Sequence, residues 1–246
     1  MTKDHYGFPI SAGWPEIDAA DMAEVDLLMI ESYGITLPQM MENAGRALAT
    51  LARGRFLGGQ VGGQSVTALA GAGSNGGGAL AAARRLAAWG ARVTVVLTQE
   101  ASALTPVPAQ QLSTLRQMGI AVAAVPPQAA DLILDGLIGY SLKGEPRGRA
   151  LDLIRWANSA ATDILALDVP SGLDAQGGFL ARTVVHAAAT LTLALPKRGL
   201  QAATHRYAVG DLYLADISVP PALYERLSTP RVVAPFALSD ILRLPT

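Results

Sequence analysis

The 246-residue chain contains no cysteine, which excludes disulfides, thiolate metal sites, iron–sulfur clusters and a cysteine nucleophile. It also lacks an excess of either charge. The 19 Lys and Arg residues stand against 20 Asp and Glu, and a net charge of −1 argues against binding nucleic acid or an anionic membrane through a broad basic surface. No run of about 18 apolar residues occurs, and the first residues do not resemble a signal peptide. We therefore expect a soluble, cytoplasmic globular protein.

Lysine is scarce, because only Lys3, Lys143 and Lys197 occur among the 19 basic residues. In a chain that otherwise uses arginine, a lysine within a glycine-rich loop is a candidate for a specific role. The alternative for each lysine is a solvated cation on a surface loop.

Beyond residue 64 the sequence alternates short apolar strands with helices. Strands that are apolar at successive positions and separated by helices are typical of a mostly parallel sheet covered on both faces. We therefore predict a doubly wound α/β fold with two leading helices, in a single domain over residues 1–246. Its expected parts are leading helices and a linker (16–64), an α/β core (65–220) and a C-terminal tail (221–246). The expected strands are 65–70, 93–97, 121–125, 132–134, 164–168, 188–195 and 211–217, and the expected helices 16–33, 37–51, 77–88, 110–118 and 151–157.

Ligands of doubly wound sheets bind beyond the carboxyl ends of the strands, so the loops that follow strands are candidate sites. The first is the glycine-rich segment 71–78, in which Gly71, Gly73 and Gly76 have the G-x-G-x-x-G spacing. Backbone amides and the helix dipole at such a turn favour a phosphate group. A structural turn between strand and helix is the alternative.

Two acids follow buried strands. Asp135 comes after Leu132–Leu134 and Asp168 after Ile164–Leu167, and a carboxylate there must be hydrogen-bonded, paired or bound to a cation. Both could face one crevice, as a general acid/base or as cation ligands. For Asp135, satisfaction by backbone amides is the alternative. The loop after Asp135 carries hydroxyl groups and Lys143 between glycines, and such a loop is able to close over an anion.

Two further loops are less specific. Pro170 stiffens the turn that presents Ser171, whereas Asp174 has the pattern of an exposed turn residue. Ser171 does not lie in a G-x-S-x-G elbow and the three histidines show no triad spacing, so a serine hydrolase is not expected. Lys197 and Arg198 follow another strand and could contact a phosphate or merely cap the sheet.

Five motifs, in this order, resemble the YjeF N-terminal domain family, the NAD(P)H-hydrate epimerases. The family patterns are M-E-N-A-G, G-x-G-N-N-G-G-D-G, D-x-x-x-G with a following P-x-x-G loop, D-[IV]-P-S-G-L-D, and A-P-K-x-G-L. They correspond to residues 41–45, 71–79, 135–148, 168–174 and 195–200. The resemblance covers roughly residues 16 to 220 and implies a Rossmann-like α/β/α sandwich, a homodimer and a bound potassium ion.

A member of this family would interconvert the R and S forms of hydrated NADH and NADPH (NADHX and NADPHX), which carry water at C6 of the nicotinamide ring. It would thereby supply an NAD(P)HX dehydratase that accepts one epimer. By this resemblance Asp168 is the acid/base at the C6 hydroxyl, and Lys143 binds a substrate phosphate or orients that carboxylate. The implied potassium ligands are Asn75, Asp135 and Ser171. The implied substrate-binding residues are Ser74, Asn75, Gly76, Gly77, Gly78, Gly139, Tyr140, Ser141, Leu142, Lys143, Gly144, Glu145 and Asp168.

The chain departs from the family pattern in the glycine-rich loop. Ser74 replaces the first Asn, Gly78 replaces the Asp, and Ala79 replaces the Gly that follows. Compensation by another acid such as Glu145, a different substrate preference and a loss of activity are all compatible with the missing carboxylate. One alternative is therefore a catalytically impaired ligand-binding or scaffold module of this fold. Another is an NAD(P)-dependent oxidoreductase, for which Gln99-Glu100 would supply the acidic residue expected just after the strand 93–97.

Overall fold

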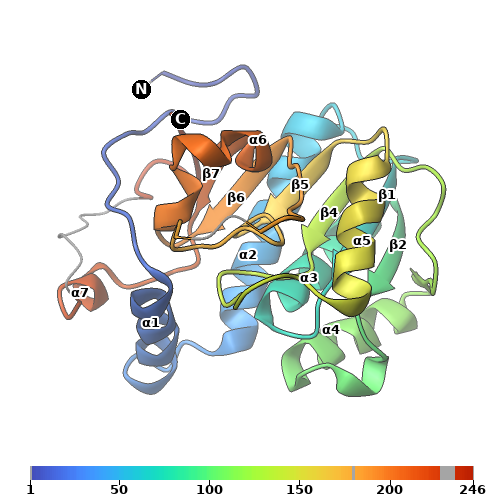
Figure 1. Ribbon diagram of the computed structural model, residues 1–246, viewed down its shortest axis with the longest axis horizontal. Helices are drawn as coiled ribbons and strands as arrows, with labels where there is room; N and C mark the ends of the chain where they lie inside the picture. Colours follow the sequence, from blue (N-terminus) through green and yellow to red (C-terminus); the bar gives the residue numbers. More distant parts are fainter. Residues whose placement is uncertain (1, 179–180, 228–235, 246) are drawn as a thin grey trace.

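The computed structural model describes residues 2–178, 181–227 and 236–245. Its centre is an eight-stranded sheet with the strand order β3-β2-β1-β4-β5-β6-β7-β8 (Figure 1). Neighbouring strands are parallel, except that β8 is antiparallel to β7. The strands are β1 (Ser65–Ala70), β2 (Arg92–Leu97), β3 (Ala121–Val122), β4 (Leu132–Gly136), β5 (Ile164–Leu167), β6 (Ala189–Leu193), β7 (Asp211–Ala215) and β8 (Ile241–Leu244).

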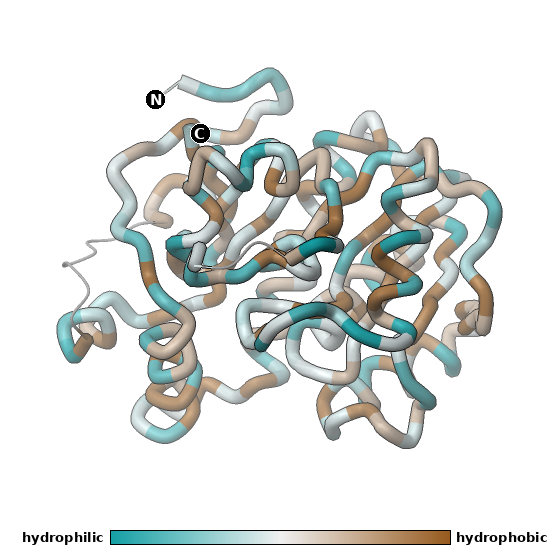
Figure 2. Tube along the Cα trace, in the orientation of Figure 1, coloured by the Kyte–Doolittle hydropathy of each residue, from teal (hydrophilic) through white to brown (hydrophobic). Residues whose placement is uncertain are grey.

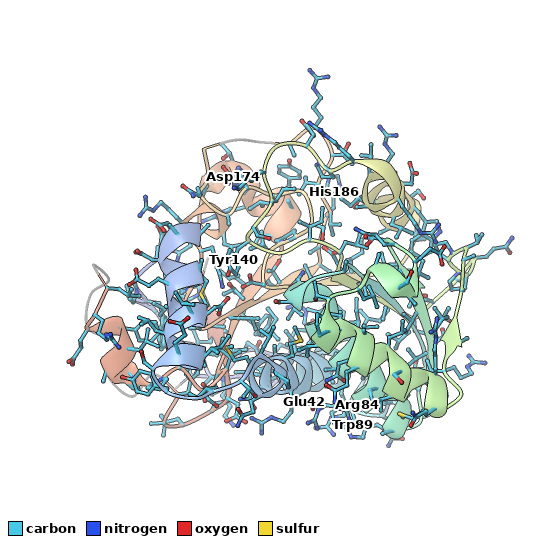
Figure 3. The ribbon with its side chains drawn as sticks, turned by 90° about the horizontal axis from the view of Figure 1, so that it is seen from below. Glu42, Arg84, Trp89, Tyr140, Asp174 and His186 are labelled. Atoms are coloured by element: carbon cyan, nitrogen blue, oxygen red, sulfur yellow. The ribbon has the colours of Figure 1, made fainter. Side chains whose placement is uncertain are left out.

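Helices cover both faces of this sheet. The view from below shows α2, α3 and α4 on one side of the sheet and α5 on the other (Figure 3). None of the helices in the described ranges is long and apolar enough to span a bilayer. The helices are α1 (Ala19–Glu31), α2 (Leu37–Leu51), α3 (Ser74–Ala88), α4 (Pro106–Gln117), α5 (Gly148–Ser159), α6 (Arg206–Val209) and α7 (Pro221–Tyr224).

The strands are apolar at successive positions because both faces of the sheet are buried. In β1, Ala68 and Ala70 belong to the apolar cluster beneath α2 and α3, whereas Leu69 belongs to the cluster beneath α5. Helices have one exposed side, so hydrophilic residues of α5 alternate with buried ones such as Leu153 and Ile154 (Figure 2). The predicted α/β class, with a mostly parallel sheet between two layers of helices, is confirmed.

The first helix packs outside this main core. The Asp18 carboxylate caps α1 by accepting hydrogen bonds from the backbone N–H groups of Ala20 and Asp21, at 2.9 and 2.8 Å. The buried face of α1 then packs with α7 and with the segments that follow β6 and β7 in a separate apolar cluster. One side of α1 therefore faces the ends of the strands.

Several boundaries differ from those expected. α3 begins at Ser74 instead of residue 77, so the glycine-rich segment forms its first turn. β3 has two residues instead of five. α2 was expected to be an extension of the α/β core, but its buried residues belong to the main apolar core. The segment 221–246 was expected to be a tail, but it contributes β8, because three of its four residues are apolar and buried against β7. Residues 228–235 and 246 of that segment lie outside the described residues.

Candidate functional site

A cavity of about 450 Å³ lies where the carboxyl ends of β5 and β6 meet α1, α2 and the first turn of α3. Apolar side chains form much of its wall, and a few polar groups converge on it. It therefore has the size and character of a small-molecule site. The polar side chains at its wall are Asp26, Ser74, Asn75, Tyr140, Ser141, Asp168 and Lys197.

Two of the glycines in the glycine-rich turn are required by close packing of the protein itself. A methyl group at Gly71 would overlap the backbone oxygen of Leu137, and one at Gly76 would overlap the backbone oxygen of Gly71. Gly73, by contrast, has open space where a side chain would be. The turn therefore packs tightly against the loop after β4, and only part of its backbone is free for a ligand.

Asp135, the residue before the last in β4, is completely buried, and its carboxylate is held by neutral donors. Ser171 donates to it twice, from its backbone N–H at 2.8 Å and from its hydroxyl at 2.6 Å, and the N–H of Leu137 donates at 3.2 Å. Removal from water raises the pKa of Asp135 to about 6, because these bonds only partly offset the desolvation. Asp135 and Ser171, two of the three residues implied as potassium ligands, thus lie in direct contact. Asp135 lies beneath the cavity wall and does not line the cavity, contrary to the expectation of a shared crevice.

Asn75 lies above this pair. It packs against Gly139, where a methyl group would lie 3.2 Å from the Asn75 Cβ atom. The Ser171 hydroxyl accepts a hydrogen bond from the backbone N–H of Ile138 at 2.8 Å, so Ser171 and Asn75 contact adjacent residues of one loop. The side-chain nitrogen of Asn75 is buried without a hydrogen-bond partner among the described residues. Among all the residues that the structure describes, no three His, Cys, Asp or Glu side chains form a cluster that could bind a metal ion.

Asp168 directly follows β5 and adopts a left-handed backbone conformation, with φ of 65°. A non-glycine residue in this region is uncommon, and Asp is one of the side chains that tolerate it best. Its carboxylate turns toward the end of β6, where it accepts a hydrogen bond from the backbone N–H of Leu193 at 3.2 Å and pairs with the ammonium group of Lys197. Lys197 also donates to the backbone oxygen of Leu193 at 2.8 Å.

Lys197 is the charged residue that the sequence analysis did not place correctly. It neither reaches into solvent for a phosphate nor caps the sheet, because it is fully buried and paired with Asp168. The signal was present in the sequence, where one of three lysines follows a buried strand. The sequence did not show which carboxylate this lysine would meet.

A second carboxyl group reaches the cavity from α1. Asp26 accepts a hydrogen bond of 2.7 Å from the hydroxyl of Tyr140, which lies close to α1 (Figure 3). Desolvation raises the pKa of Asp26, and the hydrogen bond from Tyr140 offsets part of that rise. Desolvation and the adjacent Asp26 carboxylate also raise the pKa of Tyr140, so the phenol keeps its proton. No sequence motif marks Asp26 as a residue of the site.

The expected substrate-binding residues divide between two hollows. The residues at the cavity wall are Ser74, Asn75, Gly76, Gly78, Gly139, Tyr140, Ser141 and Asp168. Gly77 faces the Met41 sulfur instead, and Gly144 lines neither hollow. Leu142, Lys143 and Glu145 line a second hollow of about 530 Å³, which shares Leu137 and Ile138 with the cavity.

Two expected roles need correction. Lys143 does not orient the Asp168 carboxylate, because Lys197 does so and Lys143 lies in the second hollow. Glu145 does not replace the missing acid at Gly78, because its carboxylate accepts from the backbone N–H of Arg182 at 3.1 Å and it does not line the cavity. The histidines are also absent from both hollows, and Figure 3 shows His186 on the side of the sheet opposite to Glu42.

Residues 37–199 match the profile of a protein family described as YjeF-related protein N-terminus. The chain belongs to this family. It is 44% identical to an NAD(P)H-hydrate epimerase of Dehalogenimonas lykanthroporepellens over 91% of this chain and 90% of that protein. It is 39% identical to an NAD(P)H-hydrate epimerase of Truepera radiovictrix over 89% and 97% of the two chains.

Two further similarities complete this comparison. A bifunctional NAD(P)H-hydrate repair enzyme, Nnr, of Salinibacter ruber is 33% identical over 86% of this chain but only 42% of its own length. The crystal structure of the yeast protein ynu0 superimposes with a TM-score of 0.77 at 24% identity, and covers 93% of this chain and 99% of the yeast chain. This structural likeness shows that the YjeF-N fold is shared.

Proposed function

We propose that the protein interconverts the R and S forms of hydrated NADH and NADPH at the cavity beside Asp168. Two relatives named NAD(P)H-hydrate epimerase support this, since this chain covers at least 90% of each. The single structural observation that carries the proposal is the Asp168–Lys197 ion pair at the wall of an otherwise largely apolar cavity. The protein is accordingly an isomerase. Neither a scaffold role nor an NAD(P)-dependent oxidoreductase is favoured by these similarities.

The chemistry requires one proton to reach the C6 hydroxyl and one to leave the incoming water. Asp168 donates a proton to the departing hydroxyl, the ring nitrogen supplies its electron pair to the C6 cation, and the hydroxyl leaves as water. Water then adds to C6 and returns a proton to the carboxylate. Lys197 stabilises the carboxylate between these steps, because its ammonium group is buried against it.

The rest of the dinucleotide has room in the second hollow. The two hollows are adjacent, because Leu137 and Ile138 line both, and we place the rest of the substrate across these two residues. Ser74–Gly78 and Gly139–Ser141 would hold the part near the ring, and Leu142–Glu145 the part beyond it. Lys143 and Arg147 line the second hollow and carry the positive charge that a phosphate group requires.

Potassium fits the residues beneath the cavity. Asp135 is a fully buried carboxylate whose hydrogen bonds come from neutral groups, and a cation would restore the interactions that it lost with water. Asn75, Asp135 and Ser171 would contribute oxygen ligands, which suit a hard, weakly held cation. When bound, the ion would supply positive charge at Asp135. The loop of residues 137–139, which contacts Ser171 through the N–H of Ile138, lines the cavity and would hold the substrate.

The proposal extends to partners and location. The functional partner is an NAD(P)HX dehydratase that uses one epimer, in keeping with the relatives named as bifunctional repair enzymes. A homodimer is supported by Leu27, Ile30 and Tyr33, which leave 51%, 43% and 41% of their surface exposed at or just after α1. A cytoplasmic location completes the proposal.

A coupled assay tests the activity. The protein is incubated with a mixture of R and S NADHX and a dehydratase specific for the S form. We expect rapid and complete consumption of both epimers, because the R form is converted as the S form is used. Consumption that stops after the S form, at the rate seen with dehydratase alone, would reject the proposed activity.

A further inference from the structure

Two carboxyl groups line the cavity, and they come from different elements. Asp168 follows β5 and is paired with Lys197, whereas Asp26 lies on α1 and is bonded to Tyr140. The four groups are close enough to interact electrostatically, since Lys197 and Asp168 both affect the pKa of Asp26. The Lys197 ammonium also lies 5.9 Å from the centre of the Tyr140 ring.

The surroundings of the two carboxyl groups differ. Asp168 has a buried ammonium group and a backbone N–H group as its partners. Asp26 has a phenol as its hydrogen-bond partner, and burial favours its neutral form. The Tyr140 hydroxyl is a donor to Asp26 and has lone pairs that can accept, and it lies at the cavity wall.

We propose that Tyr140 is a second catalytic residue of the epimerisation and that Asp26 is its positioning residue. This inference rests on the proposed function, because the R and S hydroxyls occupy opposite faces of the ring at C6. A single acid/base group reaches one face of a bound ring. Asp168 therefore serves one face, and the Tyr140 hydroxyl, backed by Asp26, serves the other.

The proton balance of this second arm closes through the solvent, because each inversion takes a proton from one carboxyl group and delivers one to the other, and exchange with water restores both. When the hydroxyl on that face departs, Tyr140 donates its proton to it and receives the proton of the Asp26 carboxyl. The C6–O bond breaks with its electron pair on oxygen, water leaves, and the ring nitrogen lone pair forms a double bond to C6. When water adds on that face, a new C6–O bond forms, one water proton passes to Tyr140, and the Tyr140 proton passes to Asp26.

Oxygen exchange separates this role from a structural one. In Tyr140→Phe, Asp168 still lets the hydroxyl on its own face leave and lets water add again on that face. We therefore expect one epimer to exchange its C6 oxygen with heavy-oxygen water while inversion falls by about 10²-fold. In Asp168→Asn we expect the other epimer, whose hydroxyl lies on the Tyr140 face, to keep exchanging its C6 oxygen. A tyrosine that only fixes the loop to α1 would lower exchange and inversion together.

The experiment uses each epimer of NADHX, purified, in heavy-oxygen water, and follows label and configuration by mass spectrometry and chiral separation. Asp26→Asn keeps an acceptor for Tyr140 but cannot supply a proton. We therefore expect it to retain oxygen exchange in one epimer while inversion slows, by a smaller factor than in Tyr140→Phe. Glu24→Gln, on the exposed side of α1, and Tyr207→Phe, exposed on α6, should match the wild type. Melting temperatures of all variants are measured alongside.

The outcomes are distinct. Loss of inversion with retained exchange in one epimer supports the inference. Unchanged inversion in Tyr140→Phe, or a parallel loss of exchange and inversion for both epimers, overturns it while the epimerase activity of the wild type stands. A wild-type protein that neither inverts nor exchanges either epimer overturns the proposed function and the role of Tyr140 together.

Discussion

Lys197 and Asp168 form an ion pair in which the lysine side chain is 0% exposed and the aspartate side chain 4% exposed. Taking two charges out of water is costly, and the cost is recovered only when both partners are present and hydrogen-bonded. A buried pair at the wall of a cavity is therefore more consistent with a chemical role than with a contribution to stability alone.

Removal of one partner should strongly destabilise the fold. We expect Lys197→Met and Asp168→Asn each to lower the free energy of unfolding, the former by about 3–5 kcal/mol, because the remaining group is buried without its partner. The double variant should lose less than the sum of the two losses. Urea unfolding measures all three. The exposed pair Arg46–Asp240 is the control, and Arg46→Met should change the free energy by less than about 1 kcal/mol. Additive losses at Asp168 and Lys197 would contradict the coupling.

Potassium should stabilise the wild-type protein through Asp135. When potassium is replaced by a bulky organic cation at constant ionic strength, we expect the melting temperature to fall, since a ligand at a hundredfold its Kd contributes roughly 3 kcal/mol. Asp135→Asn should abolish this response. Asp131→Asn is a matched control, because Asp131 also accepts from the N–H and hydroxyl of a serine, Ser65, but lies exposed away from the cavity. An unchanged potassium response in Asp135→Asn would remove the basis for the site.

Asp26 should make the stability depend on pH. Desolvation raises its pKa above the ordinary value of 3.8, so the folded state binds this proton more tightly than the unfolded chain. The contribution of Asp26 to stability is therefore fully present below 3.8 and is lost as the pH rises through the raised pKa. Asp26→Asn should be more stable than the wild type near neutral pH, and this difference should shrink as the pH falls toward 3.8. Urea unfolding across this range measures it, with Glu24→Gln as control; a gap that does not change with pH would contradict the assignment.

The two glycines where α2 meets α3 should respond differently to alanine. A methyl group at Gly45 would lie 2.5 Å from the Ala81 Cβ atom and 2.8 Å from the Ala82 backbone nitrogen, so the helices must separate. At Gly78 it would lie 2.7 Å from the end of the Leu167 side chain and at an ordinary contact distance of 3.7 Å from the Ala44 Cβ atom. A helical alanine is also favoured over glycine by about 1 kcal/mol. We expect Gly45→Ala to lower the melting temperature clearly and Gly78→Ala to leave it nearly unchanged. Equal effects would show that helix packing does not require Gly45.

Residues at the ends of strands were predictable from the sequence. Continuous apolar strands indicated a sheet covered on both faces, and this placed Asp135 and Asp168 at its carboxyl edge. The contact between Asp135 and Ser171 was implied by the family resemblance, which made both residues ligands of one ion. Asp135 lies near the end of β4, and Ser171 lies in the turn that follows the adjacent strand β5.

Other features depend on how separate elements pack, which local patterns do not encode. Lys143 was chosen over Lys197 because it lies in a glycine-rich loop, yet the left-handed backbone of Asp168 directs its carboxylate toward Lys197. Asp26 lies within the predicted helix 16–33, and only the placement of α1 against the loop after β4 brings it to Tyr140. The last strand, β8, was missed because its four residues are too few to form a recognisable pattern.

The most direct test of the account follows a single purified epimer of NADHX without any dehydratase, and compares the wild-type protein with Asp168→Asn. Chiral separation of R and S forms over time gives the rate of inversion. The account predicts rapid equilibration by the wild type and inversion slower by about 10²-fold or more in the variant, with Asp152→Asn, exposed on α5, unchanged. Equal rates in the wild type and Asp168→Asn would contradict the assignment of the chemistry to this cavity.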